Sequence, residues 1–284
     1  MLKSIDTFNR IIEMKRKLTG ETVDVLDCWK DYISPYQEIE EKCLKDALQY
    51  NFDTDIRPII VNALTLNFSK IEIAHNNSIK ELNILNEKFY NTFAINDDIF
   101  IYFYIGLCNG AGWATTVNSQ QTILLGVEKI VELNWHEEKA MIALIYHELC
   151  HIAHSMLRNQ SISISFTTQN EKSIWQLYIE GFAQRYEQIL YKDGFYHQDK
   201  NGWLRWCTDN HDEICREYLY RIKNNLSTQC FFGDWVNFKG YSDVGYYLGC
   251  EFIKYISNNY STMELANIEM CELRVVVINY LERF

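Results

Sequence analysis

The chain has 284 residues, a hydrophobic fraction of 48% and a formal net charge of −11. This composition predicts a globular protein with a substantial core. The negative charge argues against nucleic-acid and anionic-membrane partners, because both need a basic surface. The first residues lack the apolar core of a signal peptide, and no apolar run approaches the roughly 18 residues of a membrane span, so we expect a cytoplasmic protein.

The nine cysteines are scattered, at positions 28, 43, 108, 150, 207, 215, 230, 250 and 271. Their number is odd and no pair has Cys-x-x-Cys spacing, so neither a disulfide framework nor a zinc knuckle is indicated. We expect most of them to be small buried apolar residues in a reducing compartment. A second metal site is conceivable at Cys207, His211 and Cys215, which are spaced at intervals of four. Asp209-Asn210 indicates a turn or helix start between them, which would break their common face.

Residues 1–95 are predicted to form a helical region. Gly20 is the only glycine before Gly106, and a turn-poor segment with helical periodicity is typical of helices. The expected helices cover residues 5–17, 23–32, 39–48, 56–67 and 78–93. Nothing in this region suggests chemistry.

The pattern changes at Asp97 and predicts strands. Residues 99–106 are β-branched and aromatic, and residues 121–126 have a similar character. The glycine-rich segment 109–114 between them is expected to be a flexible turn. The two strands are therefore expected to pair as an antiparallel hairpin.

The sequence His147-Glu148-x-x-His151 lies in an almost unbroken apolar run. Residues four apart lie on the same face of a helix, so both imidazoles can reach one metal ion. Glu148 can then lean toward a metal-bound water as a general base. The alternative is a pair of buried neutral histidines satisfied by hydrogen bonds, since buried ionisable groups are costly unless they bind or pair.

The helix that carries this motif is predicted to run from Trp135 to about Arg158, with Asn134 as its N-terminal cap. His154 follows His151 by three residues and lies near the same face. One rigid helix rarely directs three residues at a single metal. We therefore expect His154 to lie beside the ligands or in a pocket, or to have a plain packing role.

A third ligand is expected from a second helix, at residues 171–192. Glu180 lies near the edge of the apolar stripe of this helix, next to Gly181. An interior glycine costs a helix about 1 kcal/mol relative to alanine, which is tolerable where another helix or a metal site approaches closely. We expect Glu180 to be the third ligand. The alternative is a solvated carboxylate, because Glu187 lies on the same face.

Gly245 and Gly249 bracket a pair of tyrosines, Tyr246 and Tyr247, at the start of a predicted helix that runs to about residue 258. This glycine spacing lets a backbone pack closely while a phenol points into a cleft. A tyrosine hydroxyl is a suitable donor to a developing oxyanion. The alternative is an ordinary core role for both rings.

Three segments in this order resemble a bacterial family of predicted zinc-dependent proteases, which is gluzincin-like and largely uncharacterised. They are His147-Glu148-x-x-His151, Glu180-Gly181-Phe182-Ala183 and Gly245-Tyr246-Tyr247-Leu248-Gly249, and the resemblance covers roughly residues 95–260. It implies a zincin fold and one zinc ion. The implied ligands are His147, His151 and Glu180, with Glu148 as the base.

The resemblance also implies a tyrosine that contacts the scissile carbonyl, Tyr246, with Tyr247 as the alternative. Gln184 departs from the thermolysin-like pattern, which has at this position an aspartate that orients a histidine ligand. A glutamine accepts a hydrogen bond but adds no charge, so this support is weaker or comes from elsewhere. Gln184 and His154 are the candidates for residues that flank the ligands.

A strand that precedes the metal helix can bind an extended peptide by adding it to the sheet edge. Gly112, Ile123 and Leu124 are therefore candidate substrate-binding residues, and the alternative is an ordinary core sheet.

The sequence as a whole predicts an α+β, predominantly helical, zincin-like fold with a small antiparallel sheet beside the motif helix. Residues 1–95 form its helical region and residues 96–284 its catalytic domain, unless both belong to one structural unit. The predicted activity is zinc-dependent hydrolysis of a peptide or protein substrate. The alternatives are a metal-dependent binding or regulatory module without proteolysis, and a protein without metal.

Overall fold

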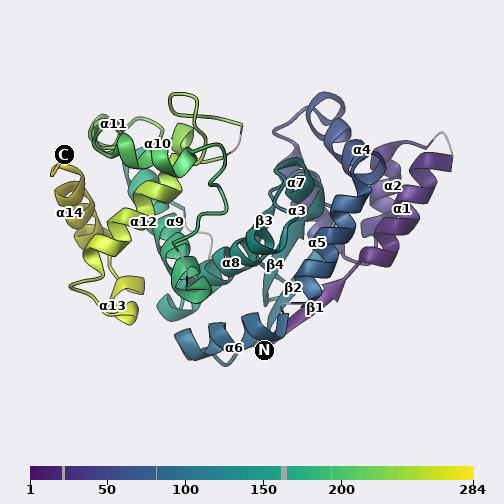
Figure 1. Ribbon diagram of the computed structural model, residues 1–284, viewed down its shortest axis with the longest axis horizontal. Coiled ribbons are helices and arrows are strands. Elements are labelled where there is room, and N and C mark those ends of the chain that lie inside the picture. Colours follow the sequence, from purple (N-terminus) through teal and green to yellow (C-terminus); the bar gives the residue numbers. More distant parts are fainter. Residues whose placement is uncertain (21–22, 81, 161–164, 193, 234) are drawn as a thin grey trace. The chain divides into compact units, whose positions relative to one another are not determined.

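The computed structural model describes residues 1–20, 23–80, 82–160, 165–192, 194–233 and 235–284 (Figure 1). The chain is α+β and predominantly helical, as predicted. It divides into two compact units, Met1–Glu148 and Leu149–Phe284. The division falls inside a long helix and not near residue 95.

The first unit combines a four-stranded sheet with helices. Its elements are β1 (Leu2–Asp6), α1 (Phe8–Gly20), α2 (Val25–Ile33), α3 (Gln37–Ala47), a short π-helix (Phe52–Ile56), α4 (Arg57–Thr65), α5 (Phe68–Lys80), α6 (Leu82–Phe93), β2 (Ile99–Tyr104), β3 (Gly112–Val117), β4 (Gln120–Gly126), α7 (Val127–Glu132) and most of α8 (Glu138–Arg158).

The sheet is mixed, with the strand order β1-β2-β4-β3. β2 and β4 pair in parallel, so the predicted antiparallel hairpin between them is wrong. The segment expected to be a flexible turn leads instead into β3, which pairs antiparallel with β4. Asn118 and Ser119 connect these two strands with φ values of 50° and 62°. Two successive positive φ angles are typical of the tight hairpin turn that matches strand twist, which explains why β3 is the hairpin partner.

The first residues of the chain form a strand, where the sequence predicted the start of a helix. β1 pairs in parallel with β2, from Leu2 opposite Ile99 to Asp6 opposite Phe103. The N-terminal residues therefore complete the sheet, and helix α1 begins only at Phe8. The helices predicted at 23–32, 39–48 and 56–67 are present within a few residues, whereas α5 was not predicted as a separate helix.

Asn134 ends helix α7 and does not cap α8. Its φ of 55° is left-handed, and its N–H donates to Val131 while the N–H of Trp135 donates to Ile130. This pair of bonds is the Schellman arrangement that closes a helix, for which asparagine is well suited. Helix α8 therefore begins at Glu138, three residues later than predicted.

The second unit is helical. After the end of α8 it contains α9 (Gln169–Tyr191), α10 (Trp203–Asp209), α11 (His211–Lys223), a short 3-10 helix (Gln229–Phe231), α12 (Val244–Ile256), α13 (Thr262–Ala266) and α14 (Met270–Leu281). The predicted capping box of Ser261 and Glu264 is present at the start of α13. None of the described helices is both long and apolar enough to cross a bilayer.

Helices α9 and α12 cross at two glycines. A Cβ atom on Gly181 would lie 2.3 Å from the carbonyl oxygen of Gly249, and one on Gly249 would lie 2.6 Å from the carbonyl oxygen of Leu177. Only glycine permits this approach at either position. The close contact expected beside Glu180 is therefore present, and a neighbouring helix makes it.

Candidate metal centre

Three side chains able to bind a metal come together on α8 and α9. One ligand atom from each of His147, His151 and Glu180 lies within 4.8 Å of the other two. His147 and His151 are four residues apart on α8, which continues unbroken through the division between the units. Glu180 comes from the middle of α9. The cluster could hold a metal ion, and its members are the three ligands predicted from the sequence.

The donor set suits zinc. Imidazole nitrogen and carboxylate oxygen are both common zinc ligands, and two ligands at about 2.0–2.1 Å from a tetrahedral ion lie about 3.3 Å apart. His151 Nε2 lies 3.2 Å from Glu180 Oε2, and these two side chains are 15% and 16% exposed. His147 is buried. The three side chains are thus largely shielded from water, and His151 and Glu180 keep a small exposed fraction.

Glu148, the predicted base, is turned toward the edge of the sheet. The residue is buried, and its Oε2 accepts a hydrogen bond from the backbone N–H of Ala114 at 2.9 Å. Ala114 lies on β3, in the segment that the sequence predicted to be a turn. This contact could not be predicted from the sequence, because it depends on the position of an edge strand that the residue pattern does not reveal.

His154 is held in a hydrogen-bond network within the second unit. Tyr178 Oη donates to the carbonyl oxygen of Leu265, so the phenol oxygen accepts from His154 Nε2, at 2.9 Å. His154 is therefore protonated on Nε2 when neutral. Burial lowers the pKa of this imidazole to about 3. These contacts indicate a packing role that ties the end of α8 to α9 and to the segment before α14.

Gln184 forms a hydrogen bond with another glutamine. It is fully buried, and its Oε1 accepts a hydrogen bond from Gln198 Nε2 at 3.2 Å. Its own Nε2 has no partner within the described part of the chain. One turn further along α9, buried Glu187 lies 3.4 Å from His197 Nδ1. The predicted orienting role of Gln184 has no contact to support it, and the sequence did not indicate this buried polar group.

The two tyrosines of the glycine-rich segment have different surroundings. Tyr247 is buried, and its ring meets His211 edge-on at 5.6 Å. Burial raises the pKa of its phenol well above the usual value. Tyr246 is only half-buried and packs edge-on against Phe232 at 5.7 Å. Tyr247 has the environment of a core residue, and Tyr246 is the more exposed of the two rings.

The three candidate substrate-binding residues fall on two strands. Ile123 and Leu124 are fully buried in β4, which pairs with β2 on one side and β3 on the other. A strand paired on both sides offers no edge to a peptide, so these two residues are core residues. Gly112 lies on β3, whose outer edge has no partner strand in the described sheet.

The cysteines behave as small apolar residues. All nine are in the reduced, thiol form, and six are buried. Burial raises the pKa of both Cys207 and Cys215 to about 12, so these thiols stay protonated. His211 Nε2 lies 3.5 Å from Cys215 Sγ. Within the described ranges, only His147, His151 and Glu180 form a metal-binding group, so the second site left open at Cys207, His211 and Cys215 is not formed.

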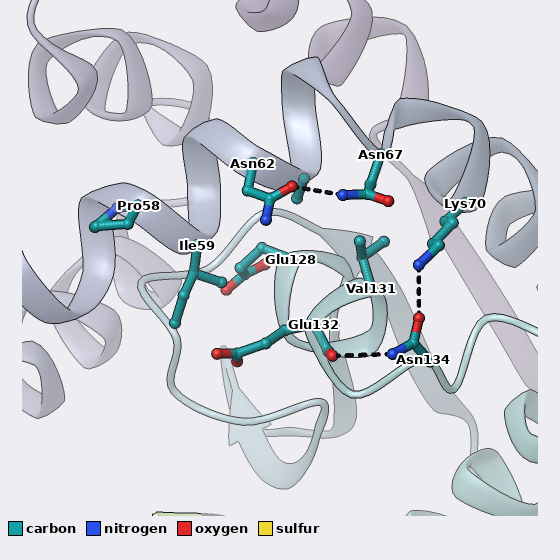
Figure 2. Close-up of a pocket in the computed structure, with 10 residues that line it drawn as sticks. Pro58, Ile59, Asn62, Asn67, Lys70, Glu128, Val131, Glu132 and Asn134 are labelled. Carbon is teal, nitrogen blue, oxygen red and sulfur yellow. Dashed lines mark hydrogen bonds between the residues drawn. The ribbon is translucent and has the colours of Figure 1, made fainter.

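A cavity of about 310 Å³ lies in the first unit and shares no residue with the metal-binding cluster. Figure 2 shows its polar side chains engaged with one another, Asn67 with Asn62 and Lys70 with Asn134. Glu128, at its wall, is fully buried, and burial raises the pKa of its carboxyl group. The polar side chains that line this cavity therefore have hydrogen-bond partners in the protein itself.

Glu128 anchors the loop between β2 and β3. Its two carboxylate oxygens accept hydrogen bonds from the N–H groups of Gly106 and Cys108, each at 3.0 Å. This carboxylate was also missed from the sequence, although Glu128 and Lys129 interrupt an otherwise apolar run, Leu124–Val131, which was a visible signal. The loop it holds leads directly to Gly112 and Ala114.

No protein-family model, no curated protein and no solved structure matches this chain.

Proposed function

We propose that this protein is a zinc-dependent metallopeptidase with a zincin-like catalytic arrangement. The observation that carries the proposal is the convergence of His147, His151 and Glu180, with donor atoms within 4.8 Å of one another. The residue after the first histidine is a buried glutamate, as a general base requires. Two imidazoles and one carboxylate are the protein ligands of many catalytic zinc sites, and they leave a fourth position open.

Zinc bound at such a site lowers the pKa of a water molecule toward about 7 and polarises a carbonyl group. Glu148 takes up one proton from the attacking water and passes it to the leaving nitrogen. The net reaction adds water across one amide: the C–N bond breaks, a C–O bond forms, and a carboxylate and an ammonium group result. The chain itself supplies the proton acceptor and the groups that orient the substrate.

Tyr246 is the proposed donor to the oxyanion. It precedes Gly249 by three residues on α12, and residues three apart are neighbours on a helix surface. Gly249 contacts Gly181, which is next to the ligand Glu180. This relation directs Tyr246 toward the part of α9 that carries the ligand, where a phenol can stabilise a developing negative charge.

Peptide and protein substrates are the proposed partners, and the reducing cytoplasm is the proposed compartment. Nine cysteines in the thiol form, most of them buried, are compatible with that environment.

The test is a metal-content measurement combined with a peptide-library assay. Purified protein should contain about one zinc per chain by elemental analysis and should cleave library peptides, as seen by mass spectrometry. A chelator should abolish cleavage and added zinc should restore it. One zinc per chain without cleavage of any peptide would favour a binding or regulatory module on the same scaffold. A protein that binds no zinc would contradict both.

A further inference from the structure

The carboxylate of Glu148 lies against the outer edge of β3, which is the edge that faces away from β4. The N–H of Gly126 donates to the carbonyl oxygen of Ala111, so Ala111 faces β4. Backbone groups alternate along an antiparallel strand, and the amides of residues 112, 114 and 116 therefore point away from β4. The Ala114 amide donates a hydrogen bond to Glu148 Oε2, at 2.9 Å. Both residues belong to the first unit.

Gly112 leaves the space that this carboxylate occupies. A Cβ atom at residue 112 would lie 2.6 Å from Glu148 Oε1, 2.7 Å from Cγ and 2.9 Å from Cδ. The φ angle of Gly112 is not positive, so its backbone conformation is open to any residue. The need for glycine at this position is a need for room beside Glu148.

The two oxygens of Glu148 are not equivalent. Oε2 accepts the Ala114 amide, whereas Oε1 accepts no hydrogen bond within the described part of the chain. A hydrogen bond from an N–H to a carboxylate is charge-assisted and directional. It fixes the rotation of the carboxylate and leaves the second oxygen available to accept a proton.

The strand that supplies these contacts is itself held in place. Glu128 binds the amides of Gly106 and Cys108, and Gly126 approaches the loop so closely that a Cβ there would lie 2.3 Å from the carbonyl oxygen of Gly110. The loop before β3 is therefore fixed at both ends. A rigid support is what a catalytic side chain needs to keep its orientation.

We propose that Gly112 and Ala114 are positioning residues for the general base. The Ala114 amide holds Oε2 of Glu148, the missing side chain at Gly112 makes room for the carboxylate, and together they present Oε1 as the proton acceptor. The role in catalysis depends on the proposed peptidase function. The placement of the carboxylate on the edge strand does not.

The first test is amide hydrogen exchange, measured by NMR on the metal-free protein. The Ala114 amide should exchange at least about 10-fold more slowly than the Thr116 amide, which points the same way on the same edge. Glu148→Ala and Gly112→Ala should each remove this protection and leave the Thr116 rate unchanged. Equal rates for Ala114 and Thr116 in the wild type would overturn the placement, whether or not the protein cleaves peptides.

The second test is kinetic. Gly112→Ala should lower kcat by about 100-fold with KM and zinc content unchanged, because only the orientation of the base is disturbed. The matched control is Gly20→Ala, since a Cβ on Gly20 meets no atom within 4 Å. Thermal denaturation of both variants separates misplacement of the base from misfolding. Wild-type kcat in folded Gly112→Ala would overturn the positioning role. If the wild type itself cleaves nothing, the proposed function fails and this role with it, and the exchange data still show where the carboxylate lies.

Discussion

Gly181 and Gly249 bring the backbones of α9 and α12 into direct contact, at a point one residue from Glu180, the proposed third ligand. A Cβ on Gly181 would lie 2.3 Å from the carbonyl oxygen of Gly249, which is backbone and cannot rotate away. The position of Glu180 therefore depends on how closely these two helices can pack.

Replacing Gly181 with alanine should force these helices apart. Overpacking of this kind typically lowers the free energy of unfolding by about 1–3 kcal/mol, more than the roughly 1 kcal/mol that alanine adds as a better helix former. Urea unfolding of the metal-free protein measures the change. Gly20→Ala is the control, because it sits in a helix with open space around it. Equal destabilisation of both variants would show that the close approach of Gly181 to Gly249 is not the cause.

The proposed base is tested by Glu148→Gln. This change keeps the shape of the side chain and removes its basicity, so kcat should fall by about 10²–10⁴-fold while zinc stays bound. Turnover is measured with a cleavable peptide and zinc by elemental analysis. Retention of full activity would show that another group accepts the proton.

The third ligand is tested by Glu180→Ala. Removing a direct ligand should weaken zinc binding by more than the roughly 10–100-fold that loss of an outer hydrogen-bond partner costs. Competition with a chromophoric chelator measures the affinity. Glu171→Ala, near the start of the same helix, should bind zinc as the wild type does. An unchanged affinity in Glu180→Ala would exclude this residue as a ligand.

His154 makes stability depend on pH. Burial lowers the pKa of its imidazole from the ordinary 6.5 to about 3 in the folded protein. Below about pH 6.5 the unfolded chain gains a proton that the folded chain does not bind. The free energy of unfolding should therefore decrease as pH falls from about 6.5 toward 3, by about 1.4 kcal/mol per pH unit from this group.

The contribution of His154 is isolated by comparison with His154→Gln, which retains a donor for the Tyr178 hydroxyl. Urea unfolding of both metal-free proteins at pH 7, 6, 5 and 4 should give a shallower decline for the variant. Parallel declines would assign the pH dependence to other groups.

Several local signals in the sequence were informative. The spacing of His147 and His151 follows from helix periodicity, and the glycine beside Glu180 indicated a close approach that the structure contains. Thr168, whose side-chain oxygen accepts from the N–H of Glu171, starts the predicted helix α9 within two residues of its expected position.

Features that depend on strand order could not be predicted in this way. The parallel pairing of β1 with β2 joins residues that are far apart in the chain, and short strands leave little periodic signal. The position of β4 between β2 and β3, which makes Ile123 and Leu124 core residues, depends on the same strand order. The contact between Ala114 and Glu148 follows from that order and was equally hidden.

The pairing of β1 has a practical consequence for handling the protein. β1 covers one side of β2, whose six residues are all isoleucine, phenylalanine or tyrosine. Loss of residues 2–6, or a tag that disturbs them, would leave a row of unpaired amides and carbonyls beside these side chains. Such an edge is a template for aggregation. The charged Lys3 and Asp6 make β1 a much poorer template, so the intact N-terminus is expected to keep the protein monodisperse at high concentration.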